Sequence, residues 1–115
     1  MIKDKTKLFK SLSDPNRLRI LNMLRVKPLC VCEITDVLQL ATSTVSRHLS
    51  ILKETGFIIE QKDGKWVNYM INPGPEDPRI SSIISTLDFW NSDNKTFEAD
   101  KTKVKKVDRY TVCSR

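Results

Sequence analysis

Apolar residues in the first part of the chain recur at helical spacing between strong stop and start signals. A first helix is predicted to end near Ser13 on an apolar face of Leu8, Phe9 and Leu12. Asp14-Pro15 then predicts a new helix, because aspartate can accept hydrogen bonds from the first free N–H groups and proline lacks one of them. Further apolar residues continue this second helix until Pro28 ends it: Leu18, Ile20, Leu21 and Leu24.

Two more helices are predicted after Pro28, separated by a short turn. Apolar residues favour a short third helix over about residues 32–39: Ile34, Val37 and Leu38. Thr42 or Ser43 is expected to cap a fourth helix, and Gly56 to stop it. The apolar stripe of that helix consists of Val45, Leu49 and Leu52. The pattern is helix, short turn, helix.

The opposite face of the fourth helix carries small hydroxyl residues around one arginine. Its members are Ser43, Thr44, Ser46, Arg47 and Ser50, with His48 beside them. Such side chains can enter a major groove and bond to phosphates and base edges. An ordinary solvated helix face can have the same composition. The choice between a DNA-binding face and a solvated face therefore depends on the segment that follows.

The following segment favours DNA binding because it reads as a hairpin. Residues 57–61 and 66–71 are strand-like, and the Asp63-Gly64 pair between them is a strong turn signal. A hairpin after such a helix is typical of a wing, and we add Lys62 and Lys65 of its loop to the expected DNA contacts. The fold predicted is mainly helical, a winged helix-turn-helix with a small β-hairpin wing.

Residues 72–78 are rich in chain breakers and predict a connector, in which Asp77-Pro78 begins another amphipathic helix that ends near Trp90. So much apolar surface in a small chain favours a homodimer through the terminal helices. The interface expected comprises Leu8, Leu12, Ile80, Ile83, Ile84 and Leu87. Residues 91–94 should interrupt the helix. The division is a domain over 1–94 and a basic tail over 95–115, either a weak helix or a loose segment.

Composition narrows the class of protein. The 115 residues leave room for one domain, and the net charge of +6 with a pI near 9.4 favours a polyanionic partner such as double-stranded DNA. No apolar run approaches the roughly 20 residues of a membrane span, and the charged start does not resemble a signal peptide. We therefore expect a cytoplasmic protein with no membrane contact. One histidine, no glycine-rich phosphate loop and no metal triad argue against an enzyme.

The Cys30-Val31-Cys32 tripeptide places two soft ligands at the front edge of the helix-turn-helix. Thiolates can bind a thiophilic ion, and an odd number of cysteines in a cytosolic protein favours free thiols or metal ligands over disulfides. If both residues were helical they would point to different faces, so one ion would have to unwind the turn to bind both. We also expect the helix N-terminus to favour the thiolate form.

Residues 8–71 resemble the ArsR/SmtB family of winged-helix metalloregulators. The motifs that carry the resemblance are Leu12 to Leu21, Leu29 to Ile34, Ser43 to Leu49 and Gly64 to Tyr69. The resemblance implies a homodimeric repressor that leaves its operator when an inducer binds. The Cys-Val-Cys motif is similar to the branch in which three thiolates hold one arsenite or antimonite ion, an inducer and not a permanent cofactor.

The third ligand of that branch is missing, because Thr35 stands where the familiar pattern has another cysteine. Zinc is not expected, since the resemblance would place its ligands on the last helix and residues 79–115 contain no histidine. Cys113 in the tail is the remaining thiol and is our candidate third ligand beside Cys30 and Cys32. The alternatives are solvent, a small thiol or Thr35. A thiol-redox or sulfide-responsive repressor, in which Cys30 or Cys32 pairs with Cys113, is the alternative function.

Overall fold

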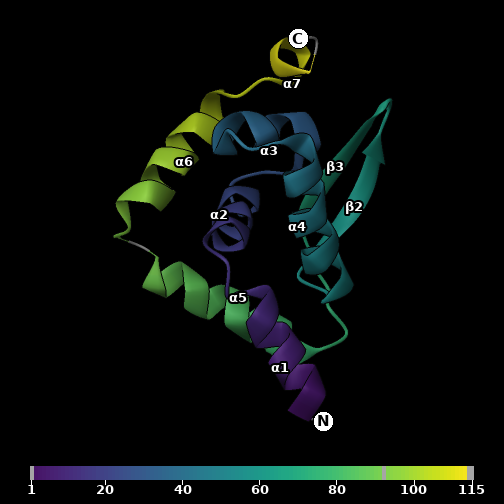
Figure 1. Ribbon diagram of the computed structural model, residues 1–115, viewed down its shortest axis with the longest axis vertical. Coiled ribbons are helices and arrows are strands. Elements are labelled where there is room, and N and C mark those ends of the chain that lie inside the picture. Colours follow the sequence, from purple (N-terminus) through teal and green to yellow (C-terminus); the bar gives the residue numbers. More distant parts are fainter. Residues whose placement is uncertain (1, 92, 114–115) are drawn as a thin grey trace.

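The computed structural model describes residues 2–91 and 93–113 and contains helices around one small sheet (Figure 1). In chain order the elements are α1 (Ile2–Ser11), α2 (Pro15–Leu24), β1 (Leu29–Cys30), α3 (Val31–Leu38), α4 (Thr42–Glu54), β2 (Ile58–Asp63), β3 (Trp66–Ile71), α5 (Pro78–Trp90), α6 (Lys95–Lys106) and α7 (Arg109–Val112). No helix in the described ranges is both long and apolar enough to cross a membrane.

The helix-turn-helix begins and ends at the signals that the sequence contains, with one exception. Asp14 caps α2 by accepting hydrogen bonds from the N–H groups of Asn16 and Arg17, as predicted. Gly56 follows α4 with φ of +92°, a conformation that side chains rarely adopt. The exception is the start of α4, where the N-cap is Ala41 and no side chain caps the helix. The predicted cap at Thr42 or Ser43 was therefore wrong, because both residues are already helical.

The wing is the predicted hairpin extended by a strand that the sequence did not reveal. β2 and β3 pair antiparallel, with Asp63 opposite Trp66 and Gly64 at φ +62° in the turn. β1 adds to the other edge of β3, with Cys30 opposite Asn68, so the strand order is β1-β3-β2. Two residues are too short to show a period, which explains why β1 was missed. This pairing fixes the residue before α3 onto the wing.

The core lies between the helix-turn-helix and the sheet. Its fully enclosed side chains include Ile20 and Met23 of α2, Ile34 of α3, Val45, Leu49 and Leu52 of α4, and Phe57 between α4 and β2. The apolar stripes predicted for the second, third and fourth helices therefore face one another. Helix α4, which we take as the recognition helix of the predicted helix-turn-helix, is packed on one side by this core, and its opposite face is exposed.

Residues 95–112 form two helices, α6 and α7, so the tail is helical. In Figure 1, α6 runs beside α2 and α3, and α7 lies beyond the end of α3. Val104 is fully buried and Phe97 is 7% exposed, so α6 adds to the core. Asp100 is also buried, and its two carboxylate oxygens accept hydrogen bonds from Arg19 Nε at 2.9 Å and Nη2 at 3.0 Å. A bidentate ion pair with an apolar flank therefore fixes α6 to α2.

Helices α1 and α5 lie together at one end of the molecule (Figure 1). Leu8 and Ile80 are buried within the chain itself, so these two residues of the predicted interface are not available to a partner in this structure. Leu12, Ile83, Ile84 and Leu87 remain partly exposed. Three large aromatic side chains that the prediction omitted are more than half exposed: Phe9, Phe89 and Trp90.

The Arg19–Asp100 pair predicts a stability effect. Asp100→Asn should lower the free energy of unfolding by about 2–3 kcal/mol, because it leaves the Arg19 guanidinium without its counter-charge. Urea unfolding monitored by circular dichroism measures this. Glu98→Gln on the same helix removes an exposed pair with Lys101 and should cost less than about 0.5 kcal/mol. Equal losses in the two variants would contradict the anchoring role.

Candidate thiol site and nucleic-acid interface

The three cysteines of the chain meet at the N-terminus of α3. Their sulfur atoms all lie within 4.8 Å of one another, and the Sγ atoms of Cys30 and Cys113 are 3.7 Å apart. Cys32 and Cys113 form a disulfide, with Cα atoms 5.3 Å apart, and Cys30 is a free thiol. In the described part of the chain, no other group of His, Cys, Asp and Glu side chains gathers closely enough to hold an ion.

Cys30 and Cys32 lie together because they do not both belong to the helix. Cys30 ends β1 and is the N-cap of α3, with extended backbone angles of −87° and 168°, whereas Cys32 lies in the first helical turn. The divergence predicted for two helical residues therefore does not apply here, because Cys30 is not helical. One ion can approach both sulfur atoms while α3 stays intact.

Burial raises the pKa of the Cys30 thiol above its ordinary value, and the nearby Glu33 carboxylate also disfavours the thiolate. The same carboxylate accepts a hydrogen bond from the Cys30 N–H at 3.0 Å, so it holds the start of α3 in place. The expectation that the helix N-terminus would favour a thiolate was wrong for Cys30. The residue is 4% exposed, and this burial is the larger effect.

A hollow of about 320 Å³ opens beside Cys32 and Cys113. Its other lining residues are Thr35, Asp36, Thr42 and Val112. The Thr35 hydroxyl donates a hydrogen bond to the Val31 carbonyl one turn earlier, so it already has a partner within the helix. Thr42 is the first residue of α4, which means that the sulfur site and the start of the recognition helix share one cavity.

The outward face of α4 carries most of the residues predicted to contact DNA. Ser43, Ser46 and Arg47 are exposed and Thr44 is partly exposed. At the wing, Lys62 and Lys65 are exposed. Lys65 Nζ lies 4.9 Å from the centre of the Trp66 ring. Positively charged side chains are therefore exposed at two separate places, Arg47 on α4 and the two lysines at the tip of the hairpin.

His48 does not belong to this outward face. It is 3% exposed and lies between α4 and α2, where Arg17 Nη1 is 3.1 Å from its Nδ1. A guanidinium can only donate, so Nδ1 must accept and the ring must be neutral. Desolvation lowers the pKa of His48, although Asp14 at 3.9 Å opposes the change. The predicted DNA contact at His48 was wrong, because its ring packs inward.

Sequence reasoning missed the contacts between α7 and the wing. Arg109 Nη2 donates to Asp63 Oδ2 at 2.8 Å, and its guanidinium carbon is 5.2 Å from the centre of the Trp66 ring. Tyr110 meets the same ring edge-on, with the ring centres 6.0 Å apart. No periodic pattern links residues so far apart in the chain, so only the fold reveals this contact.

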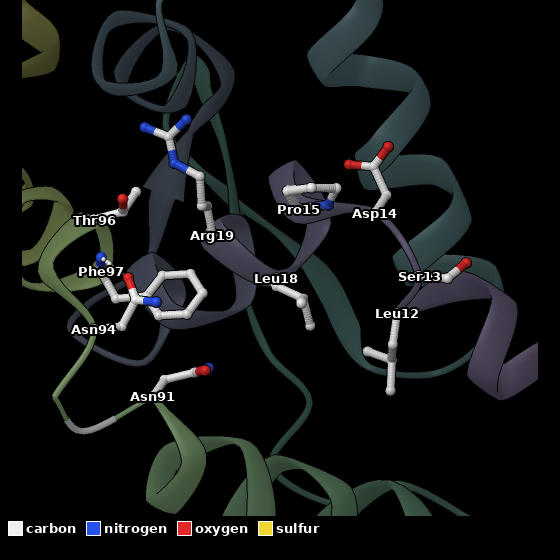
Figure 2. Close-up of a pocket in the computed structure, with 10 residues that line it drawn as sticks. All are labelled: Leu12, Ser13, Asp14, Pro15, Leu18, Arg19, Asn91, Asn94, Thr96 and Phe97. Carbon is white, nitrogen blue, oxygen red and sulfur yellow. Dashed lines mark hydrogen bonds between the residues drawn. The ribbon is translucent and has the colours of Figure 1, made fainter.

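A larger hollow of about 480 Å³ lies away from the cysteines, between the α1–α2 junction and the α5–α6 junction (Figure 2). Figure 2 shows Leu12 and Leu18 on one side of it and Phe97 on the other. Asn91, Asn94 and Thr96 line the remaining edge. It brings together none of the residues predicted to bind an ion or DNA.

Comparison with known proteins identifies the family. Residues 14–60 match the model described as bacterial regulatory protein, arsR family. Arsenic resistance transcriptional regulator ArsR1 of Pseudomonas putida is 42% identical over 89 residues, which cover 74% of this chain and 70% of that protein. The chain belongs to the ArsR family. It is a DNA-binding transcription regulator and not an enzyme, as predicted.

Two other relatives match over shorter shares of their length. The arsenical resistance operon repressor of Escherichia coli K12 is 42% identical over 67 residues, 57% of each chain. The cadmium resistance transcriptional regulatory protein CadC homolog of Staphylococcus aureus is 39% identical over 82 residues, 70% of this chain and 64% of that protein. The chain therefore spans little more than half of the Escherichia coli repressor.

Solved structures confirm the winged helix-turn-helix. HlyU from Vibrio cholerae N16961 has a TM-score of 0.66 and 27% identity, covering 78% of this chain and 94% of that one. The homodimeric winged helix-turn-helix domain of Mb0332 from Mycobacterium bovis has a TM-score of 0.67 over 82% of this chain and 83% of that one, at 19% identity. The fold predicted from the sequence is therefore confirmed.

The neutral, buried His48 predicts a pH dependence of folding. The pKa of His48 is lower in the folded chain than in the unfolded chain, where it is near 6.5. As the pH falls from 7 to 5, the unfolded chain therefore binds a proton at this ring more readily than the folded chain does, and the free energy of unfolding should decrease. Urea unfolding across this range measures the slope. His48→Gln should flatten it, even if the variant is less stable at pH 7. The same slope in both proteins would contradict this assignment.

Proposed function

We propose that this ArsR-family regulator is a repressor released from its operator when arsenite or antimonite binds Cys30, Cys32 and Cys113. The observation that carries the proposal is the meeting of three sulfur atoms within 4.8 Å, although Cys113 is 81 residues from Cys32 in the chain. The relatives named for arsenic resistance support the choice of inducer. The arrangement supplies a third sulfur ligand where Thr35 replaces the familiar cysteine.

The chemistry requires three thiols. Arsenous acid carries three hydroxyl groups on arsenic, and each leaves as water when a thiol proton is transferred to it and a sulfur–arsenic bond forms. Arsenic remains trivalent throughout, so no oxidant or reductant is consumed. In the form that carries the Cys32–Cys113 disulfide, a small-molecule thiol must first reduce it: two such thiols supply two electrons and two protons, leave as their own disulfide, and free the thiols of Cys32 and Cys113. The hollow beside these two residues gives the inducer a route to their sulfur atoms.

Release follows from the position of the site. Cys30 and Cys32 flank the start of α3, which packs against α4, and Thr42 at the beginning of α4 lines the same hollow as Cys32 and Cys113. An ion that draws the three sulfur atoms together acts on the base of the recognition helix. By linkage, an inducer that prefers one position of α4 must weaken the binding of an operator that prefers another.

The operator is double-stranded DNA bound by α4 and the wing. The proposed contacts are Ser43, Thr44, Ser46, Arg47, Lys62 and Lys65. Ser50 continues the same exposed face one turn later. Hydroxyl groups and one arginine on the helix can bond to base edges and phosphates, while the wing lysines add phosphate contacts.

We propose further that two copies assemble through α1 and α5. Leu12, Ile83, Ile84 and Leu87 are only partly buried, and Phe89 and Trp90 are 79% and 68% exposed. Exposed aromatic side chains of this size favour a partner. A homodimer would place two recognition helices on one operator, at half-sites roughly 10 base pairs or a multiple apart.

DNA binding is tested at Arg47. Arg47→Ala should weaken operator binding in fluorescence anisotropy while leaving the arsenite affinity unchanged, because its exposed side chain lies on the groove-facing side of α4. The loss of one phosphate contact per protomer should also lower the salt slope by about one unit for each contact. Arg47→Lys, which keeps the charge, should retain more of that slope. Normal binding by Arg47→Ala would contradict the proposed docking.

The dimer is tested at Leu87. Leu87→Asp should produce monomers in sedimentation velocity and a loss of operator affinity, because a buried unpaired charge costs several kcal/mol. Thr86→Asp places the same charge on the exposed neighbouring residue and should remain dimeric. If both variants remain dimeric, the interface does not include Leu87 and the proposed assembly through α1 and α5 is wrong.

The sulfur ligands are tested by titrating the reduced repressor–operator complex with arsenite. Cys32→Ser should abolish release. Cys113→Ser should raise the arsenite concentration required for release by at least about tenfold, because removing even a residue that only supports a metal ligand typically lowers affinity by about 10- to 100-fold. Both variants should bind operator normally without arsenite. Zinc should not cause release. A wild-type arsenite response in Cys113→Ser would exclude the tail from the site.

One observation favours a second function, repression relieved by thiol oxidation. The structure already pairs Cys32 with Cys113. Two thiols and one hydrogen peroxide molecule give this disulfide and two waters, with two electrons passing from sulfur to peroxide. If peroxide releases the operator and arsenite does not, the redox function holds and the metalloid function fails.

A further inference from the structure

The short helix α7 joins the sulfur site to the tip of the wing. Cys113 follows α7 directly and is its C-cap, while Arg109 and Tyr110 in its first half contact the wing. Arg109 reaches both strands, since Nη2 donates to Asp63 Oδ2 on β2 and Nη1 lies 3.4 Å from Asn68 Oδ1 on β3. The four residues of α7 therefore run from the hairpin that carries Lys62 and Lys65 to Cys113.

The contacts of α7 are suited to forming and breaking. None of its residues is buried, in contrast to α6, which ends at Lys106 with Val104 in the core. The Arg109 side chain is 18% exposed and that of Asp63 is 56% exposed, so solvent competes for the ion pair. An ion pair with one partner this exposed contributes little alone. Apart from the peptide bonds to α6, the bond between Cys113 and Cys32 is the strongest contact that holds the end of α7 against α3.

We propose that α7 is a latch that couples the sulfur site to the wing. When Cys113 is bound, either to Cys32 or through a shared metalloid, α7 is held in place and Arg109 fixes Asp63 and Asn68. When the three thiols are free, α7 detaches and the wing regains its motion. The inference rests on the proposed function for its metalloid branch, and on the observed disulfide for the oxidised branch.

In this proposal a held wing opposes operator binding because α7 contacts the hairpin next to its lysines. Arg109 and Lys65 both lie against the Trp66 ring, at 5.2 Å and 4.9 Å from its centre. Arg109 therefore occupies the same aromatic ring that Lys65 contacts, directly beside a lysine proposed to bind a phosphate. A wing must adjust to the backbone of the duplex, and the latched hairpin is fixed at its tip by α7.

The test measures the wing directly. Hydrogen–deuterium exchange of residues 58–71 is followed in the reduced protein, after hydrogen peroxide, and after arsenite, for wild type and Arg109→Gln. Closure of the site is measured separately by titrating the free thiols. Arg25→Gln is the matched control, because Arg25 also pairs with a distant aspartate, Asp88, without touching the wing. Operator affinity is measured in each state by fluorescence anisotropy.

Closing the site should slow wing exchange several-fold in wild type and Arg25→Gln, and should not slow it in Arg109→Gln, although the same thiols are lost. The fall in operator affinity on closure, expected within the roughly 5- to 150-fold range of allosteric couplings, should shrink towards one in Arg109→Gln. Asp63→Asn, which removes the partner on the wing, should behave in the same way and guards against a folding defect at Arg109.

The proposal is overturned if closure leaves wing exchange unchanged in wild type, if Arg109→Gln responds as wild type does, or if a slowed wing leaves operator affinity unchanged. Failure of the metalloid function looks different. Arsenite would then leave the thiols and the operator unaffected, while peroxide would still close the site and slow the wing through Arg109.

Discussion

The packing of α6 along α2 is the constraint on which the thiol site depends. Val104 and Phe97 supply the apolar contact, and the Arg19–Asp100 pair fixes the register between the two helices. Because α6 is anchored in this way, the chain returns across α3 and delivers Cys113 to Cys30 and Cys32. Without the anchor, a thiol 81 residues from Cys32 would meet it only by chance closure of a long loop.

The same path of the chain connects two surfaces that winged-helix proteins use for DNA. Cys30 ends a strand paired with the wing and Cys32 begins α3, which supports the recognition helix α4. Cys113 adds a third connection, since α7 contacts the hairpin through Arg109 and Tyr110. A chemical change at the three sulfur atoms therefore bears on the base of the recognition helix and on the tip of the wing.

Periodic apolar stripes and turn signals were sufficient to predict the helix-turn-helix, the hairpin and the connector before α5, because each depends on neighbours within a few residues. The features that the sequence missed or left open have other causes. β1 is too short to show a period. α6 is polar enough that the sequence left it open between a weak helix and a loose tail, although Val104 and Asp100 are buried. His48 lies between Arg17 and Asp14, a contact between helices that spacing within α4 cannot reveal. Cys113 was singled out by its chemistry, whereas its place beside Cys30 depends on the whole course of α6.

X-ray absorption at the arsenic edge tests the central claim most directly, because it counts the sulfur atoms bound to arsenic. The account predicts three sulfur neighbours in the reduced wild-type complex and two in Cys113→Ser, with an oxygen atom taking the third position. An unchanged sulfur count in Cys113→Ser would contradict it, since the C-terminal helices would then play no part in holding the inducer.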